Sequence, residues 1–382
     1  MPSALKGLKV LDFSTLLPGP FASMYLADMG AEVIHIESPT RPDLVRIMPP
    51  YANGQATAHS YLNRNKQSIA LDLKDAANIE LLKNKISEFD IVVEQFRPDV
   101  MRRLGLDYET LAEINPRLIY CSITGYGQTG SYKDRAGHDI NYLALAGVSG
   151  HCGRQDGGPP PLGIQIADVA GGSLHAVIGI LAAVIERQRS GIGQYIDISM
   201  TDCVASLNSM AASASLAGQT PQGPEQGMLN GASFYDYYET KDGRYFSVGS
   251  LEPQFMAGLA AALDLPILLA KGASFDPEDR QAVKQALQEK FKTQDFAAWQ
   301  QLFQNLDICV EPVLSLDEAL VSPIADQRGW VVDVPLSENA SQTEPQLACP
   351  IKFSRSQMVY TFIGQALGEG NGRKYAHMIA EC

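Results

Sequence analysis

LKVLDFSTLLPGPFASMYLADMGAEVIHIES, residues 8–38, contains two strand-like runs on either side of one helical run. The first run is short and β-rich, a Pro-Gly-Pro turn follows at Pro18–Pro20, and apolar residues then recur at helical spacing up to Gly30. A second β-rich run ends near Glu37. A strand, a helix and a strand in this order form a βαβ unit, so we expect a parallel sheet.

Four later runs extend the same pattern. Strand-like residues occur at 68–73, 91–94, 118–123 and 195–199, with helical stretches between most of them. The first half of the chain is therefore predicted to be a doubly wound α/β domain. The acidic end of the second strand is typical of a dinucleotide fold. However, the G-x-G-x-x-G motif is missing and Gly19 alone does not replace it, which argues against a nicotinamide enzyme.

The second half of the chain changes in composition. Residues 213–227, SASLAGQTPQGPEQG, are rich in Gly, Pro, Gln and Ser, as linkers are. Residues 234–250 have the pattern of a hairpin, and helical patterns follow from Gln254 to Leu302. After Trp330 come two strand-like pieces, VVDVP and ACPIKFS. We predict a large α/β domain at 1–205, completed by 330–382, a linker at 206–226, and a smaller α+β domain at 227–329.

Composition disfavours several classes of partner. The 382 residues are 45% hydrophobic, enough for a large core, and the formal net charge is −13. Nucleic acid and anionic membranes need a concentrated excess of Lys and Arg, so we expect neither as a partner. Six scattered cysteines without CxxC spacing, and no apolar leader in MPSALKGLKVLDF, favour a cytoplasmic setting. Residues 169–185 are mostly apolar, but Asp168 and His175 lie at or within them, which favours a core helix over a membrane span.

Two motifs contain candidate catalytic groups. His138 lies in GHDINYLALAG (137–147), although a lone histidine is more often a structural residue than a catalyst. Asp168 lies in ADVAGGS (167–173), at the start of the apolar helix. Asp is a preferred N-cap residue, so capping alone explains it. Capping does not explain the two glycines that follow, which let another backbone or a ligand approach closely.

Taken together, the motifs resemble a known family. Six stretches of the chain are similar to the α-methylacyl-CoA racemases of the family III CoA-transferase superfamily. They are LPGPFASMYLADMGAEVIHIE, NRNKQSIALDLK, GHDINYLALAG, ADVAGG, GQYIDISM and FYDYYETKDGRYFSVGSLEPQF. The resemblance covers about Leu5 to Phe255 and is looser beyond. It implies a two-domain α/β fold, an acyl-CoA substrate with no further cofactor, and an interlocked homodimer. The active site would then lie between the large domain of one subunit and the small domain of the other.

The resemblance also implies that His138 and Asp168 are two bases, which remove and return a proton on opposite faces of the carbon α to the thioester. Glu252, with Asp139 as the second candidate, is implied to orient and charge the imidazole. An imidazole with an ordinary pKa of about 6.5 suits this task, whereas the pKa of a carboxyl near 4 must be raised by burial. Neighbouring helical residues diverge by about 100°, which favours Glu252 as the partner of His138. We expect backbone N–H groups near Asp168 and Gly171 to stabilise the enolate oxygen.

Coenzyme A carries a diphosphate and a 3′-phosphate, so an acidic protein needs local cations to bind it. Such cations occur in QFRPDVMRRLG and NRNKQS, although each one alone is better explained as a solvated surface charge. By resemblance, the LLP segment lines the adenine or pantetheine path, and Lys74 is a weaker cation candidate. The predicted coenzyme contacts are Arg97, Arg103, Arg102, Arg64, Lys66, Leu16, Leu17 and Pro18. No cluster of His, Cys and carboxylates has metal-ligand spacing, so we expect no metal.

Two other functions stay open at this point. In a CoA transferase of the same superfamily, Asp168 attacks the thioester and forms an acyl-enzyme anhydride, so His138 is dispensable. The region that matches a protective glycine-rich loop, GMLNGAS (227–233), has only two glycines, which favours the racemase. The third interpretation is a catalytically silent protein that binds acyl-CoA. The sequence does not specify the acyl chain.

Overall fold

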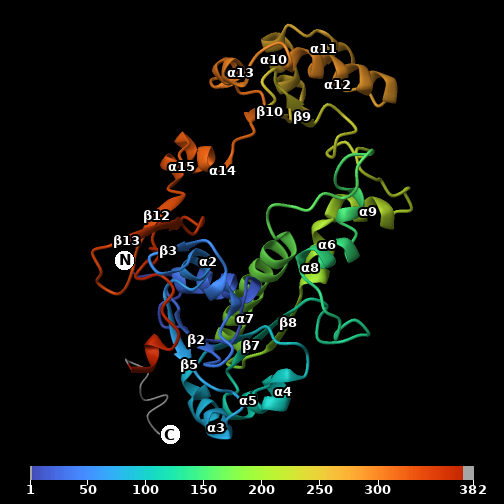
Figure 1. The fold of residues 1–382 in the computed structure, drawn as a ribbon. Helices are drawn as coiled ribbons and strands as arrows, with labels where there is room; N and C mark the ends of the chain where they lie inside the picture. The colour runs from blue at the N-terminus through green and yellow to red at the C-terminus, as the bar shows by residue number, and fades with distance from the viewer. Residues whose placement is uncertain (1, 373–382) are drawn as a thin grey trace. The chain divides into compact units, whose positions relative to one another are not determined.

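The computed structural model describes residues 2–372, which form two compact units (Figure 1). Within the described residues, the larger unit is drawn from residues 2–146, 162–207 and 323–372. The smaller unit is drawn from Gly147–Pro161 and Asn208–Ser322. Residues 147–161 therefore belong with the smaller unit, although the sequence prediction placed them in the large domain. The part of the predicted large domain at 373–382 lies outside the described residues.

A six-stranded sheet lies at the centre of the larger unit (Figure 1). Its order is β5-β2-β1-β6-β7-β8, and every neighbouring pair is parallel. The prediction of a mixed α/β fold with a large parallel sheet is confirmed. The strands are β1 (Lys9–Asp12), β2 (Glu32–Glu37), β5 (Lys66–Ala70), β6 (Ile91–Glu94), β7 (Ile119–Thr124) and β8 (Tyr195–Ser199).

The chain order reverses between β1 and β6. From β1 the strands run outward through β2 to β5, and the chain then returns to the other side of β1 to build β6, β7 and β8. The loops at the carboxyl ends of β1 and β6 therefore diverge and leave a crevice between them. In doubly wound sheets, this crevice is the usual place for a ligand.

Helices pack against both faces of the sheet. The ring of Tyr195 in β8 lies 5.7 Å from the ring of Tyr108, centre to centre, whereas Gly179 lies against Ile196. Adjacent strand residues point to opposite faces, so the helices carrying Tyr108 and Gly179 cover opposite faces. The helices of the larger unit are α1 (Pro18–Asp28), α2 (Thr57–Leu62), α3 (Ala76–Lys85), α4 (Val100–Leu104), α5 (Tyr108–Ile114), α6 (Asp139–Leu145), α7 (Leu174–Ser190), α8 (Met200–Leu207) and α15 (Pro323–Arg328).

The apolar helix Ala167–Ser190 passes the length and composition test for a membrane span, a test that core helices of soluble proteins also pass. Along its apolar stretch, 44% of the residues are buried inside the structure. Arg187 near its end is buried and pairs with Asp90 at 2.9 Å. Ile178 and Ile185, two turns apart, are exposed.

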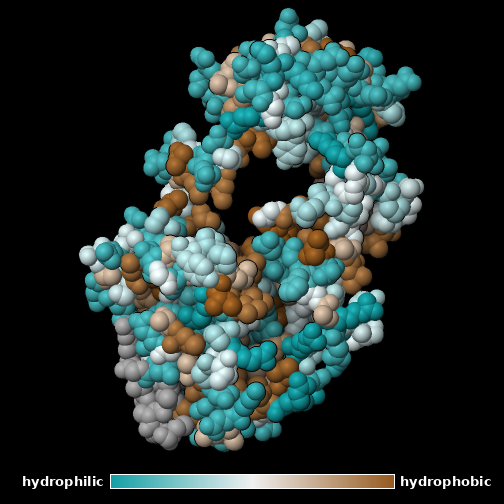
Figure 2. Space-filling view, viewed as in Figure 1, coloured by the Kyte–Doolittle hydropathy of each residue, from teal (hydrophilic) through white to brown (hydrophobic). Residues whose placement is uncertain are grey.

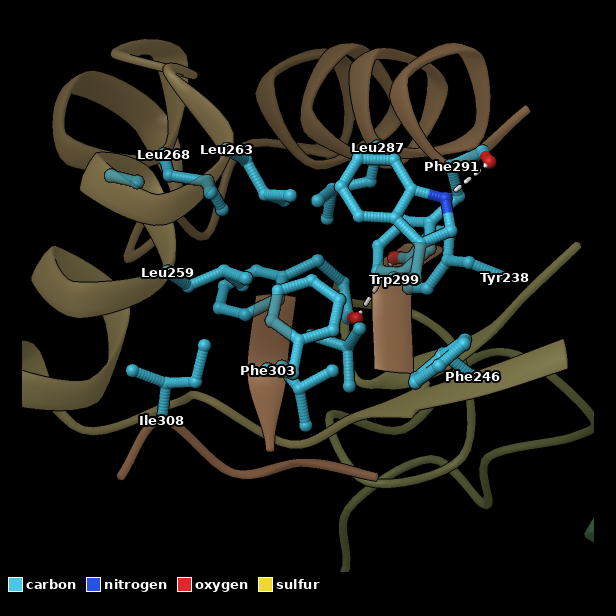
Figure 3. Close-up of a cluster of buried hydrophobic side chains, with 14 of the residues drawn as sticks. Tyr238, Phe246, Leu259, Leu263, Leu268, Leu287, Phe291, Trp299, Phe303 and Ile308 are labelled. Carbon is cyan, nitrogen blue, oxygen red and sulfur yellow. Dashed lines mark hydrogen bonds between the residues drawn. The ribbon is translucent and has the colours of Figure 1, made fainter. Parts of the chain in front are cut away.

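The smaller unit is built on an antiparallel sheet of order β11-β10-β9. Its β9 (Asp236–Glu239) and β10 (Tyr245–Val248) form the predicted hairpin. Aromatic rings fill its core (Figure 3): Trp299 stacks on Phe303 at 5.6 Å, and its Nε1–H donates to the carbonyl oxygen of Phe291. The other elements of this unit are β11 (Val310–Pro312), α9 (Ser209–Leu216), α10 (Pro253–Leu263), α11 (Ile267–Lys271), α12 (Pro277–Phe291), α13 (Phe296–Phe303) and α14 (Leu316–Leu320).

Charged residues hold residues 147–161 within the smaller unit. The guanidinium of Arg154 donates to both carboxylate oxygens of Asp236, each at 2.8 Å, and to Glu225 at 2.8 Å. Lys284 pairs with the same two carboxylates, at 2.9 Å and 3.6 Å. This cluster joins three parts of the chain that are distant in sequence.

One predicted strand is absent, and part of the predicted linker is helical. The piece ACPIKFS (348–354) forms no strand, and β12 (Val331–Pro335) pairs instead with β13 (Thr343–Leu347). The buried side chains of β13 are Glu344 and Gln346, so an apolar alternation could not reveal it. The helix α9 also occupies part of the predicted linker. A short hairpin in the larger unit pairs β3 (Tyr51–Ala52) with β4 (Gln55–Ala56).

Candidate active site

A cavity of about 560 Å³ lies at the carboxyl ends of the central strands of the larger unit. Its walls come from the loops that follow β1, β6 and β7, among them Leu16, Phe96 and Gly125. His138 and Asp168 both line it. The structure therefore brings the two sequence-predicted bases together at the crevice where the strand order reverses.

His138 immediately precedes α6, and its side chain is exposed. Its backbone is extended, with φ −131° and ψ 176°. Its N–H donates to Oδ1 of Asn141 at 3.0 Å, which closes the first turn of the helix. This backbone bond fixes the point from which the imidazole reaches the cavity.

Asp168 lies in a π-helical turn, η4 (Ala167–Ser173), that continues into α7. Single π turns are rare and occur frequently at functional sites. Burial, together with the carboxylate of Asp139, raises the pKa of Asp168 to about 6, and His138 opposes this shift. A carboxyl with this pKa exchanges its proton readily near neutral pH.

Asp139, the first residue of α6, contacts the backbone of this turn. The N–H groups of Ala167 and Asp168 donate to its Oδ1 at 2.6 Å and 3.0 Å. The structure thus joins Asp139 to Asp168 and uses the Asp168 N–H for this contact. That backbone N–H groups near Asp168 and Gly171 stabilise an enolate stays a prediction.

The two glycines after Asp168 allow close packing of protein segments. A Cβ on Gly171 would lie 3.0 Å from the side chain of Val204 and 3.3 Å from the carbonyl oxygen of Met200. A Cβ on Gly172 would lie 3.0 Å from the Met200 side chain. The glycines therefore let α8 approach the turn that carries Asp168.

The predicted coenzyme cations differ in their placement. Arg97 is exposed and lines the cavity. Arg102 and Arg103 are exposed in α4 but are not among the lining residues. Lys133 and Arg135 line the cavity and were not predicted. They precede His138 closely in SYKDRAGHD, and this proximity was the signal available in the sequence.

The structure corrects the prediction for Arg64 and Lys66, which are both fully buried. Arg64 forms a two-pronged ion pair with Asp28, with N–O distances of 3.0 Å and 2.6 Å. Lys66 donates to the carbonyl oxygen of Pro20 at 2.9 Å and lies 3.5 Å from Asp12. Both cations therefore have structural partners and present no charge to a coenzyme.

The turn between β1 and α1 contributes Leu16 to the cavity and α1 contributes its first residue, Pro18, whereas Leu17 is not among the lining residues. The N–H of Gly19 donates to Oε1 of Gln95 at 2.8 Å. A Cβ on Gly19 would lie 2.8 Å from this same oxygen, so the close approach requires glycine.

Tyr142 was not predicted and lines the cavity one turn after His138. Its hydroxyl donates to the carbonyl oxygen of Gly137 at 2.6 Å, and burial raises its pKa to about 12. A Cβ on Gly125 or Gly137 would lie 2.5 Å or 2.7 Å from the Tyr142 ring. These two glycines make room for the ring beside His138.

Glu252 belongs to the smaller unit, where it is exposed and immediately precedes α10. Its pairing with His138 stays a prediction. Within residues 2–372, no group of three or more His, Cys, Asp or Glu side chains is arranged to hold a metal ion.

Comparison with known proteins identifies the family. The sequence model described as CoA-transferase family III matches residues 5–369. The chain belongs to this family, as the motifs predicted.

Relatives with two different activities are similar to this chain. The α-methylacyl-CoA racemase of Mus musculus is 40% identical over 321 residues, which cover 83% of this chain and 79% of that protein. The succinyl-CoA:glutarate CoA-transferase of Homo sapiens is 34% identical over 336 residues, which cover 86% and 76%. A crystal structure of a CAIB/BAIF family protein from Brucella suis matches with a TM-score of 0.85 at 30% identity, covering 99% of this chain and all of that one.

Proposed function

We propose that this protein is an acyl-CoA racemase or epimerase, which inverts the carbon α to the thioester of a 2-methylacyl-CoA. One observation carries the proposal: His138 and Asp168 line the same cavity, and burial raises the pKa of Asp168 to about 6. Similarity to racemases at about 40% identity supports this activity over transfer.

In the proposed reaction, the carboxylate of Asp168 removes the α proton on one face of the substrate. The electron pair of the C–H bond moves into the thioester and forms an enolate. The imidazolium of His138 then delivers a proton to the opposite face, and the product has the inverted configuration. The reverse reaction exchanges the two roles, so each group must be able to both take and give a proton.

A second carboxylate is proposed to orient the imidazole. Asp139 is already bonded to the backbone of Ala167 and Asp168, which leaves Glu252 as the better candidate for this role. Arg97, Lys133 and Arg135, which line the cavity, are proposed to bind the phosphates of coenzyme A, with Arg102 and Arg103 as further cations on α4. No cofactor other than the coenzyme A of the substrate is proposed.

A homodimer in the cytoplasm is part of the proposal. Large apolar side chains are exposed on α6, α7 and α8, and Figure 2 shows apolar side chains on the viewed face of the larger unit. Monomeric soluble proteins rarely expose extended apolar patches. The exposed side chains on these helices are Ile140, Leu145, Ile178, Ile185 and Leu207. A stable, active monomer in sedimentation would contradict a dimer.

The test of the racemase is isotope exchange. A chiral 2-methylacyl-CoA incubated with the enzyme in D₂O should lose its configuration and gain deuterium at the α carbon. Mass spectrometry over a panel of acyl chains measures both and identifies the preferred chain. The racemase is wrong if no member of the panel exchanges.

The transferase is the second candidate because the relatives at 34% identity move CoA between carboxylates. In that reaction, the Asp168 carboxylate attacks the thioester carbonyl and expels the CoA thiolate, which leaves a mixed anhydride. Hydroxylamine trapping of acylated Asp168, with activity retained in His138→Ala, would favour the transferase. Calorimetric binding of an acyl-CoA with neither exchange nor transfer would indicate a silent binder.

A further inference from the structure

Leu16 has a backbone conformation that is unusual for its side chain. Its φ is +62°, in the left-handed region that favours glycine. In a free chain a residue like leucine adopts this region roughly ten- to a hundred-fold less often than an ordinary conformation, so surrounding groups must hold it there. Leu16 lies in the turn between β1 and α1 and lines the cavity that contains His138 and Asp168. The strained residue therefore forms part of the candidate active site.

A buried carboxylate holds this residue in place. The N–H of Leu16 lies 3.1 Å from Oδ1 and 3.0 Å from Oδ2 of Asp43, which is 3% exposed. Oδ1 of Asp43 also accepts the N–H of Val45 at 3.1 Å, at the start of the short helix η1 (Leu44–Ile47). Asp43 follows β2, so a side chain from one loop fixes the backbone of the neighbouring loop.

Burying the Asp43 carboxylate away from water is energetically unfavourable, and capping η1 does not require it. The contact with Leu16 is the other role that its position allows. Among the described residues, no Lys or Arg lies within ion-pair distance of this carboxylate. The carboxylate accepts hydrogen bonds from the backbone N–H groups of Leu16 and Val45. Burial raises its pKa, and the two N–H groups and His35 act in the opposite direction. A capping residue for a four-residue helix does not need to be buried, since the exposed Asp75 caps α3 in the ordinary way.

We propose that Asp43 is a positioning residue for the substrate cavity. It holds Leu16 in the left-handed conformation, so that the Leu16 side chain forms a wall of the cavity before α1 begins at Pro18. The inference rests on the proposed function, in which this cavity binds an acyl-CoA. Asp43 acts through Leu16 and does not touch the reacting atoms.

The first test compares Asp43→Ala, Asp43→Asn and the control Asp75→Ala. Asp43→Ala should raise the KM for the 2-methylacyl-CoA about tenfold or more, with a smaller change in kcat, because it deforms the cavity wall and leaves the bases in place. Asp43→Asn should recover most of the affinity, since one side-chain oxygen remains to accept both N–H groups. Asp75→Ala should leave KM unchanged. A KM for Asp43→Ala that matches that of Asp75→Ala would overturn the proposal.

The second test does not depend on turnover. Glycine adopts the left-handed region readily, so Leu16→Gly should make the carboxylate less necessary. Thermal unfolding should therefore show a smaller drop in Tm for Asp43→Ala in the Leu16→Gly background than in the wild type. Equal drops in both backgrounds would show that Asp43 does not hold Leu16.

A variant that does not fold, or a wild type that does not exchange, still leaves a measurable result. If Asp43→Ala does not fold, recovery of folded protein on adding Leu16→Gly supports the proposal, and continued failure contradicts it. If the wild type exchanges no acyl-CoA, the proposed function fails, whereas calorimetric binding of coenzyme A to the same variants and the Tm comparison still test Asp43.

Discussion

Asp139 and Asp168 are joined by a hydrogen bond in which the backbone N–H of Asp168 donates to Oδ1 of Asp139 at 3.0 Å. The bond connects the first residue of α6 to the π turn, and His138 directly precedes that residue. It therefore fixes the two candidate bases relative to each other. It also places a second negative charge near the Asp168 carboxyl, which raises the pKa of Asp168.

Asp139→Asn should separate these two effects. The amide oxygen still accepts the backbone N–H groups, but the negative charge is removed, so the pKa of Asp168 should fall. The acid limb of the pH profile for α-deuteration should move to lower pH by the same amount. Asp139→Ala loses the acceptor as well and should reduce kcat more strongly. An acid limb that stays in place in Asp139→Asn would exclude the electrostatic role.

Removal of either base should leave one-sided exchange. In His138→Ala, Asp168 still faces one side of the α carbon, so one enantiomer should exchange its α hydrogen with D₂O without inversion. In Asp168→Asn, the other enantiomer should exchange instead. Inversion should fall by about a hundredfold or more in both variants. Exchange of the same enantiomer in both would contradict the placement of the bases on opposite faces.

Gly125→Ala and Gly137→Ala should each damage the site through Tyr142. The new Cβ would lie 2.5 Å or 2.7 Å from a ring that is only 6% exposed, so the ring and the segment that carries His138 must shift. Such overpacking costs about 1–3 kcal/mol of unfolding free energy. Chemical denaturation and kcat should both report the loss. Gly163→Ala is the matched control, because its Cβ would meet no atom within 4 Å.

Glu94→Gln should change how stability depends on pH. Glu94 is buried at the end of β6, where its Oε2 accepts the N–H of Phe96, and burial raises its pKa from 4.5 to about 7. Between these values the unfolded chain binds fewer protons than the folded one, so the folded state loses stability as pH rises.

Glutamine does not ionise, so the Glu94→Gln variant does not lose this stability as the pH rises. Relative to the wild type, it should gain up to about 3 kcal/mol at pH 8 and nothing at pH 4. Urea denaturation at the two pH values measures the difference. Glu113→Gln, at an exposed position in α5, should leave the pH dependence as it is. An equal effect of Glu94→Gln at both pH values would contradict the buried, protonated state.

Arg97→Gln should weaken binding of coenzyme A about tenfold, because a cation that lines the cavity is lost from an acidic protein. Added salt should reduce the difference between the variant and the wild type. Arg102→Gln is the comparison: this exposed cation lies 3.7 Å from Asp99 and does not line the cavity. Equal losses of affinity in both variants would contradict a direct contact from Arg97. They would show that the summed positive charge of the arginines on and next to α4 attracts the coenzyme.

The sequence predicted the elements whose signal is local. Ile91–Glu94 and Tyr195–Ser199 were predicted residue for residue, because both are rich in the β-branched and aromatic residues that favour strands. The hairpin around Lys241–Gly243 was equally clear. The strand Thr343–Leu347 was missed because its buried side chains are polar and bond to other polar groups from distant segments, such as Ser60.

The sequence motifs predicted which residues belong to the candidate site, but they did not predict which groups those residues contact. The motifs placed His138 and Asp168, which line one cavity. The true partner of a cation depends on the fold, and Arg64 looked like a phosphate ligand until the fold placed Asp28 against it. The strain at Leu16 was also invisible, because no residue pattern shows that a leucine has a positive φ.

The ion cluster around Arg154 forms only when separate parts of the chain are present together. A polypeptide of residues 208–322 alone would leave the carboxylates of Asp236 and Glu225 with Lys284 as their remaining ion-pair partner among the described residues. A polypeptide of residues 1–207 would carry Arg154 without either carboxylate. Neither unit is encoded by one uninterrupted stretch of gene, so a recombination event that exchanges one unit for a relative's must cut the gene in several places at once.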